Sequence, residues 1–265
     1  MKKVIHYCWF GGNSIPESAQ RCIDSWKKFL PDFEIIQWNE TNFDINTCEY
    51  VKEAYSHKKW AFVSDYARFK ILLENGGLYF DTDVEVIKPL DEIILKGSFL
   101  GCEKLMINPG LGMGFDFDNN KKGKMIIEEI LNFYEGIHFE NPDGSLNQTT
   151  IVEYTTTVFK KYGFKEKNSI QEINGISIYP NEYFCPMDPI EKKVIITDKT
   201  LTIHHYDASW YGKPEKEIIN LCQFLNKKLQ LPWRISKRIS VLLINLKYEG
   251  LFKTFKRFLN KIIKK

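Results

Sequence analysis

The chain has 265 residues, 43% hydrophobic and 27% charged, which suffices for one large α/β domain or two small ones with a sizeable core. Its six cysteines are scattered without paired spacing, which argues against a disulfide framework and indicates reduced thiols. The net charge of +3 is uneven, because residues 227–265 hold 12 basic residues and one acidic residue. We therefore expect an acidic body followed by a basic tail.

The sequence carries few signals for targeting or for large partners. Its N-terminal stretch MKKVIHYCWFGG is too short and too polar for the apolar region of a signal peptide. No apolar run reaches the ~18 residues that a membrane-spanning helix needs. No nucleic-acid-binding motif is present, so nucleic acid is not an expected partner. These features predict a cytoplasmic protein.

Strands and helices alternate along the first part of the chain. Val4–Phe10 and Phe33–Trp38 read as buried strands, and Ser18–Phe29 between them has apolar residues at helical spacing. This order predicts a βαβ start to a mostly parallel sheet. Ser64 is expected to cap the next long helix, which the sequence Asn75-Gly76-Gly77 ends.

The following strand carries two acidic residues. Leu78–Ile87 alternates apolar and polar residues and contains Asp81 and Asp83. Two carboxylates in an apolar strand are costly to bury unless a cation or hydrogen-bond donors meet them. Ligands of open α/β sheets bind at the carboxyl ends of strands. We therefore predict that this pair binds Mn²⁺ or Mg²⁺ with a diphosphate; acids that face water from a strand edge would give the same pattern.

A second triplet of this kind, Asp116–Asp118, precedes two asparagines and two lysines and reads as a solvated loop without metal. Later elements are helices at 124–134 and 148–162 and a strand at 201–205. Beyond 230, Leu251–Ile263 has apolar residues at spacings of three and four with basic residues between them, as in a basic amphipathic helix. This tail either binds an anionic membrane surface or packs on the body.

Several other side chains could contribute to a site. Asp65 and Arg68 share a helix face and form either a surface ion pair or a sugar-binding pair. Trp9 precedes two glycines and is either a core residue or a platform for a nucleobase. His204 and His205 are adjacent on a strand, so that only one should face the site, as a metal ligand or as a structural residue.

The motifs IHYCWFGG, SDYARFKILLENGGLYFDTD and IHHYDASW together resemble the glycosyltransferase family 32 sugar transferases. This family includes bacterial capsule and lipopolysaccharide enzymes and fungal initiating mannosyltransferases, and the catalytic domains of clostridial glucosylating toxins are more distantly similar. The resemblance implies a GT-A fold, an α/β architecture with a Rossmann-like, mixed and mostly parallel sheet flanked by helices. It also implies a retaining transfer of a hexose from a nucleotide-sugar donor, with UDP favoured, and a Mn²⁺ or Mg²⁺ ion.

The resemblance also implies roles for single residues, all of them on the donor side of the site. The base would stack on Trp9, the nucleotide would lie along Tyr79, and the donor sugar would be held by Asp65 and Arg68. Asp81 and Asp83 would bind the ribose, the metal and the diphosphate. His205, or else His204, would make a further contact with the metal or a phosphate. Ser209 and Trp210 would cover the diphosphate.

The acceptor side is less defined. Many relatives have a Thr-Gly-Pro motif there, whereas this chain has Asn147-Gln148-Thr149-Thr150. Gly110–Gly114 would either shape the acceptor pocket or form an ordinary loop. The expected acceptor is a saccharide or a lipid-linked glycan.

The predicted organisation is a transferase domain over residues 1–230 and a basic helical tail over 231–265. The predicted function is metal-dependent hexose transfer in the synthesis of cell-surface polysaccharide. In a front-face reaction the leaving phosphate takes the acceptor's proton, and double displacement through a carboxylate is the other route. Alternative functions are metal-dependent nucleotidyl or phosphoryl transfer, or binding of glycans or membranes without catalysis.

Overall fold

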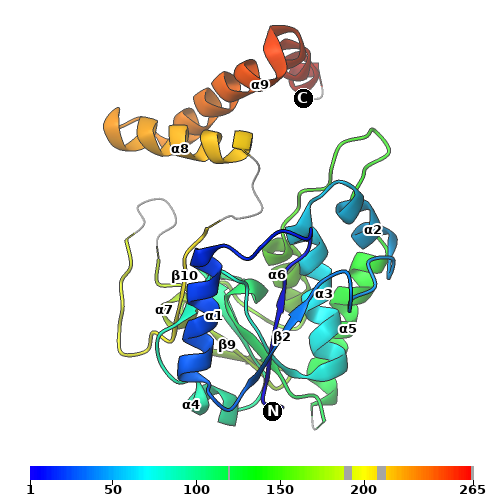
Figure 1. Cartoon of the computed structure of the whole chain (residues 1–265), viewed down its shortest axis with the longest axis vertical. Helices are drawn as coiled ribbons and strands as arrows, with labels where there is room; N and C mark the ends of the chain where they lie inside the picture. The colour runs from blue at the N-terminus through cyan, green and yellow to red at the C-terminus, as the bar shows by residue number, and fades with distance from the viewer. Residues whose placement is uncertain (119, 188–192, 208–212, 264–265) are drawn as a thin grey trace. The chain divides into compact units, whose positions relative to one another are not determined.

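The structure is a computed structural model that describes residues 1–118, 120–187, 193–207 and 213–263 (Figure 1). The chain divides into two compact units, Met1–Asp207 and Ala208–Lys265. Its elements, in chain order, are β1 (Val4–Cys8), α1 (Glu17–Phe29), β2 (Glu34–Trp38), α2 (Glu49–Ser56), α3 (Trp60–Asn75), β3 (Gly77–Tyr79), β4 (Val84–Val86), α4 (Asp91–Leu95), β5 (Phe99–Glu103), β6 (Met106–Ile107), the 3₁₀ helix η1 (Pro109–Leu111), β7 (Met113–Phe115), α5 (Lys121–Glu135), α6 (Ile151–Lys161), β8 (Gln171–Ile173), β9 (Ile176–Tyr179), α7 (Asn181–Phe184), β10 (Thr202–His204), α8 (Lys213–Lys228) and α9 (Trp233–Ile263).

The first unit is built on a mixed sheet with the strand order β2-β1-β3-β7-β5-β9-β8. The neighbours β2, β1 and β3 are parallel, and so are β5 and β9. Antiparallel β7 lies between these two groups, and antiparallel β8 forms one edge. Most strands therefore point in one direction, which confirms the expected α/β fold with a mixed, mostly parallel sheet.

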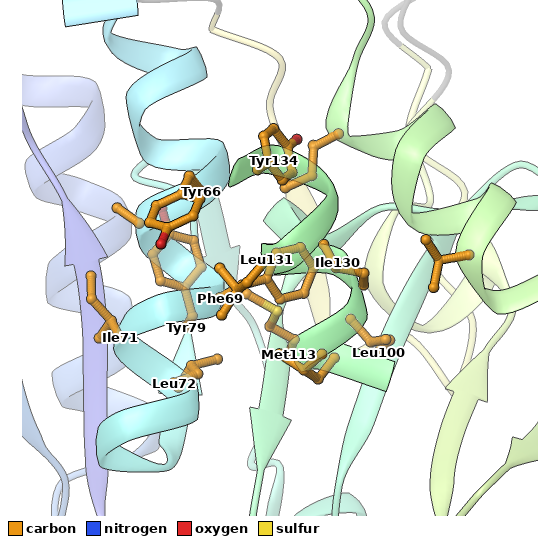
Figure 2. Packing of buried hydrophobic residues seen from close by; sticks show 14 of the residues in the cluster. Tyr66, Phe69, Ile71, Leu72, Tyr79, Leu100, Met113, Ile130, Leu131 and Tyr134 are labelled. Carbon is orange, nitrogen blue, oxygen red and sulfur yellow. The ribbon is translucent and has the colours of Figure 1, made fainter. Parts of the chain in front are cut away.

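Helices cover both faces of this sheet (Figure 1). Alternation along the strands sends Ile5 and Leu78 to the face that packs against α1, whereas Cys8 and Tyr79 face α3. Figure 2 shows the α3 side, where side chains of α3 and α5 meet those of β3, β5 and β7. The labelled members of this cluster are Tyr66, Phe69, Ile71, Leu72, Tyr79, Leu100, Met113, Ile130, Leu131 and Tyr134.

Helix α3 leads directly to the acidic pair. It begins at Trp60, four residues before the expected cap, and the Ser64 hydroxyl donates to the Trp60 carbonyl inside the helix. The helix extends further because buried Phe62 and Val63 continue its apolar face. It ends where predicted. Gly77 follows with φ +92°, and a Cβ there would lie 2.6 Å from the Val4 carbonyl oxygen, so only glycine lets β3 approach β1 this closely.

The second unit consists of α8 and α9, and the expected domain boundary near residue 230 falls between them. Cys222, Leu225 and Ile244 are buried, and Glu217 of α8 accepts hydrogen bonds from Lys247 and Tyr248 of α9. Gly250 has non-helical angles of φ 77° and ψ 167°, which divide α9 into two helical stretches. Among the described helices, none combines the length and apolarity needed to cross a bilayer.

Candidate functional site

The acidic pair occupies a turn at the carboxyl end of β3. We expected one continuous strand over 78–87, but β3 ends at Tyr79, and the Val84 amide donates to the Asp81 carbonyl at 3.0 Å to close a turn. The chain then enters β4, which leaves the main sheet and pairs antiparallel with β10. This second pairing brings His204 opposite Val84. The turn therefore joins two sheets, and both supply side chains to the site.

Arg68 connects the helix α3 to this turn. Its guanidinium donates to Asp65 Oδ1 at 3.0 Å and to Asp81 Oδ2 at 3.2 Å, and it lies over the Tyr79 ring at 5.1 Å. The Tyr79 hydroxyl donates to Asp81 Oδ1 at 3.1 Å. Arg68 is 3% exposed and Asp65 is 7% exposed. The spacing-based alternative of a surface ion pair is therefore wrong, because the pair is buried.

Burial sets the charges in this cluster. It raises the pKa of Asp65 to about 7, against the opposing effect of Arg68. Burial also raises the pKa of Asp81, where Arg68 again opposes the shift and the charge of Asp83 adds to it. The cluster thus holds two carboxylates that are costly to ionise and one guanidinium that offsets them.

Asp83 lies between two donors from the end of the first unit. Its Oδ1 is 3.2 Å from His204 Nε2, and its Oδ2 accepts from the Asp207 amide at 3.1 Å. Burial opposes the charge of Asp83, but His204 and the amide outweigh it and lower the pKa of the carboxyl. Burial likewise opposes the imidazolium of His204, yet Asp83 raises its pKa well above the usual value. His204 and Asp83 therefore form a partly buried ion pair.

The neighbouring histidine points elsewhere, as expected for adjacent strand residues. His205 Nε2 lies 2.8 Å from Glu85 Oε2, and the His205 amide donates to the Asp83 carbonyl. Of the two histidines, His204 is the one whose ring reaches the acidic pair. An imidazolium has no free lone pair for a metal, so a cation-binding role of His204 would require loss of its proton. The metal-ligand roles of both histidines stay predictions.

The donor set at Asp81 and Asp83 fits a divalent cation bound together with a diphosphate. The two carboxylates carry like charge; burial is the main cause of the raised pKa of Asp81, the charge of Asp83 adds to it, and a cation would relieve both effects. No three His, Cys, Asp or Glu side chains converge as a metal site within the described part of the chain. The remaining ligands would therefore be water and phosphate oxygens, which Mg²⁺ accepts readily.

Of the other predicted donor-side residues, Trp9 and Tyr79 are described by the structure, and Ser209 and Trp210 are not. Trp9 follows β1 and is partly buried, with its indole donating to the Asn13 carbonyl at 2.7 Å. Tyr79 is buried beneath Arg68, and its role toward a nucleotide stays a prediction. Ser209 and Trp210 lie outside the described residues.

The second Asp-x-Asp triplet takes part in a different contact. Asp116 accepts a 2.9 Å ion pair from the amino group of Met1, and this hydrogen bond lowers the pKa of the carboxyl. The Asp116 carboxylate is thus already paired with the amino group of Met1.

Sequence reasoning missed a polar group beside Asp81. Glu103 ends β5 and accepts from Asn108 Nδ2 at 2.8 Å, while Asn108 Oδ1 accepts from the Gly110 amide. A Cβ on Gly110 would lie 2.0 Å from Asp81 Oδ2, so this turn packs directly on the acidic pair. The sequence feature that could have identified Glu103 is its position as an acidic residue at the end of the apolar strand sequence FLGCE. The same feature identified Asp81.

Residues 16–100 match the family model described as a glycosyltransferase sugar-binding region containing a DXD motif. Inositol phosphoceramide mannosyltransferase 1 of Schizosaccharomyces pombe is 31% identical over 109 residues, which cover 37% of this chain and 33% of that protein. The uncharacterized glycosyltransferase L373 of Acanthamoeba polyphaga mimivirus is 31% identical over 108 residues, which cover 38% and 43%. The chain therefore spans less than half the length of the curated relatives that it matches.

Three solved structures are similar to the chain at low identity. PaToxG glycosyltransferase is 18% identical with a TM-score of 0.40, covering 60% of this chain and 68% of its own. A glycosyltransferase involved in glycosylation of the PBCV-1 major capsid is 13% identical with a TM-score of 0.42, covering 78% and 95%. The galactosyltransferase LgtC is 14% identical with a TM-score of 0.43, covering 78% and 88%.

Proposed function

We propose that the chain transfers a sugar from a nucleotide-diphosphate donor to a saccharide acceptor, because residues 16–100 match the family model of glycosyltransferase sugar-binding regions that contain a DXD motif. One observation carries the proposal above the others. Arg68 is buried at the carboxyl end of β3 and is shared by Asp65 and Asp81. The guanidinium of Arg68 can donate hydrogen bonds to phosphate oxygens, and the two carboxylates can accept hydrogen bonds from sugar hydroxyls. Both kinds of group lie at the edge of the sheet where ligands of such folds bind.

The residues of this cluster suggest a division of labour. Arg68 would donate to phosphate or sugar oxygens from a fixed position, since three hydrogen bonds and the Tyr79 ring hold its guanidinium. Asp65, with a pKa of about 7, can accept from or donate to sugar hydroxyls near neutral pH. Asp81 and Asp83 would hold Mn²⁺ or Mg²⁺. When bound, such an ion neutralises charge on a leaving diphosphate.

We propose a hexose as the transferred sugar, UDP as the carrier and retention of the anomeric configuration. In a front-face reaction the bond from the anomeric carbon to the phosphate oxygen breaks, the bond to the acceptor oxygen forms, and the leaving phosphate takes the acceptor's proton. The enzyme then needs no strong base of its own. Its main contributions are fixing the donor and excluding water, which agrees with a cluster that is largely buried.

We further propose that the second unit binds the anionic inner face of the cytoplasmic membrane, close to lipid-linked glycans used for capsule or lipopolysaccharide synthesis. In its described part, apolar side chains that are about half exposed lie on α8 and α9, or directly after α8 for Leu229, together with exposed basic residues. The apolar set is Phe224, Leu229, Ile235, Leu242 and Leu243, and the basic set is Lys227, Lys228, Arg234, Lys237 and Arg238.

A donor screen tests the proposal. The protein is incubated with UDP- and GDP-linked hexoses and Mn²⁺, and release of nucleoside diphosphate is measured for the wild type and for Asp83→Ala. We expect metal-dependent release with at least one donor and a loss of about 100-fold or more in the variant. Asp118→Asn, in the second triplet, is the matched control and should leave turnover unchanged.

Two results would contradict the proposal. Release of pyrophosphate or a sugar phosphate in place of nucleoside diphosphate would indicate nucleotidyl or phosphoryl transfer. Absence of turnover with every donor, with intact fold and metal present, would indicate a module that binds without catalysis.

A further inference from the structure

A closed series of contacts connects Asp81 to Asp83 around one side of the site. Its first half runs through a tight turn. The Asp81 amide donates to the Gly110 carbonyl at 3.0 Å, the Gly110 amide donates to Asn108 Oδ1 at 2.9 Å, and Asn108 Nδ2 donates to Glu103 Oε2 at 2.8 Å. Glu103 is thus connected to Asp81 through Asn108 and Gly110.

The second half runs through Tyr206. A hydrogen bond joins its side chain to Glu103, and its hydroxyl lies 2.9 Å from Cys185 Sγ. The Tyr206 ring packs against the His204 imidazole with 4.1 Å between centroids, and His204 pairs with Asp83. Residues from β5, η1 and β10 therefore meet beside the acidic pair, none of them from the donor-side helix α3.

Glu103 differs from every other carboxylate of this site in its partners. Asp81 has Arg68 and Asp83 has His204, whereas no cation pairs with Glu103 among the described residues. Its known donors are the uncharged amide of Asn108 and the hydroxyl of Tyr206. A carboxylate accepts about four hydrogen bonds, so capacity for further donors remains.

The surroundings of Glu103 favour a neutral hydroxylic ligand. Glu103 is partly exposed, so a ligand can reach it, and its carboxylate is oriented from within by two fixed donors. A sugar hydroxyl is an uncharged donor, and a carboxylate that is already oriented by other donors accepts its hydrogen bond well. The donor sugar is assigned to Asp65 and Arg68 on α3. Glu103 lies across the Asn108–Gly110 turn from that pair.

From this arrangement we infer that Glu103 binds a hydroxyl group of the saccharide acceptor. The inference rests on the proposed function and extends it to the acceptor, for which sequence patterns suggested only the Gly110–Gly114 loop and the segment Asn147-Gln148-Thr149-Thr150. Glu103 accepts a hydrogen bond in this role and takes no proton. Asn108 and Tyr206 are positioning residues that fix its carboxylate.

The test separates acceptor binding from donor chemistry. Octyl glycosides of glucose, galactose and mannose are screened as acceptors with the donor that the wild type cleaves, and KM and kcat are measured for acceptor and donor. Glu103→Gln should raise the acceptor KM about 10-fold to 100-fold, the loss expected for one hydrogen bond to a charged group. The donor KM and the slow hydrolysis of donor without acceptor should not change.

Two further variants guard against a purely structural explanation. Tyr206→Phe keeps the ring against His204 and removes one donor to Glu103, so it should raise the acceptor KM by a smaller factor. Glu172→Gln, an exposed carboxylate on β8, is the matched control and should change nothing.

An acceptor KM unchanged in Glu103→Gln, or donor hydrolysis lost together with transfer, would overturn the inference alone. Failure of every glycoside to stimulate the wild type would also overturn it. Absence of nucleoside diphosphate release from the wild type would overturn the proposed function and the inference together.

Discussion

His204 Nε2 lies 3.2 Å from Asp83 Oδ1, and this pair joins the last strand of the first unit to the acidic turn. The contact exists because β10 pairs with β4 in a separate two-stranded sheet. The adjacent His205 contacts Glu85 on the other side of the same strand. The two histidines therefore form a natural pair of test and control positions.

Replacing His204 should impair the site far more than replacing His205. His204→Gln leaves the partly buried Asp83 without its cation, and we expect donor turnover to fall about 10-fold to 100-fold and the Mn²⁺ concentration for half-maximal activity to shift. His205→Gln should change both values less than threefold. Kinetics over a Mn²⁺ titration provide the measurement. A larger effect at His205 would instead support its role as the metal contact implied by the family resemblance.

Gly110→Ala should strongly reduce the proposed donor turnover without unfolding the protein. Its Cβ would lie 2.0 Å from Asp81 Oδ2 and 3.0 Å from Arg68 Nη1, so the acidic turn must move. Because a displacement of about 1 Å can cost 100-fold in rate, we expect donor turnover to fall by about that factor. Gly136→Ala, where the added Cβ meets only ordinary contacts at 3.5 Å or more, is the control. Circular dichroism would verify the fold of both variants, and full activity of Gly110→Ala would contradict the geometry.

The stability of the first unit should fall as pH drops from about 6.5 to about 4. His6 is 1% exposed, its Nδ1 accepts from the Trp38 indole at 3.0 Å, and its Nε2 lies 3.1 Å from the Gly76 carbonyl oxygen. Burial lowers its pKa to about 4. The unfolded chain binds a proton near pH 6.5 and the folded chain does not, so the stabilisation is present above pH 6.5 and is lost on acidification. The full effect is about 3 kcal/mol.

Urea unfolding of the wild type and His6→Gln at pH 7 and pH 5 measures this contribution. The wild type should lose more stability than the variant between these two pH values. Equal pH dependence in wild type and His6→Gln would show that His6 does not titrate as described.

Removing the residues after Gly250 should weaken the binding of the protein to anionic membranes. Residues 251–265 include six basic residues, each worth about 1 kcal/mol near an anionic surface at low salt. The truncation leaves α8 and the first stretch of α9 in place. Binding to vesicles containing phosphatidylserine, measured by co-sedimentation, should fall at least tenfold, and turnover with a soluble acceptor should persist. Neutral phosphatidylcholine vesicles serve as the control. Undiminished binding to the anionic vesicles would refute the membrane role of this segment.

The residues that pack the sheet were the most predictable part of this protein. The apolar runs of β1 and β2 and the spacing in α1 are local patterns, and each element lies within a few residues of its predicted range. The end of α3 at Asn75 was equally predictable, because the two glycines after it have positive φ angles.

Long-range pairing was the part that local patterns could not predict. The alternation over 78–87 is compatible with one strand, and only the pairing of β4 with β10 shows why the chain turns at Asp81–Asp83. For the same reason the sequence identified Asp65, Arg68 and the acidic pair as candidates but not Glu103. Its partners Asn108 and Tyr206 come from separate segments that only the tertiary structure brings together.

The hydrogen bond from the Asp207 amide to Asp83 Oδ2 has a thermodynamic consequence. Asp207 is the last residue of the first unit, so a carboxylate oxygen of the acidic pair is tied to the exit point of the chain. A ligand that binds this oxygen shares it with the Asp207 amide and, by drawing on the same negative charge, weakens the hydrogen bond. By reciprocity, whatever restrains the chain at Asp207 weakens that ligand by the same free energy.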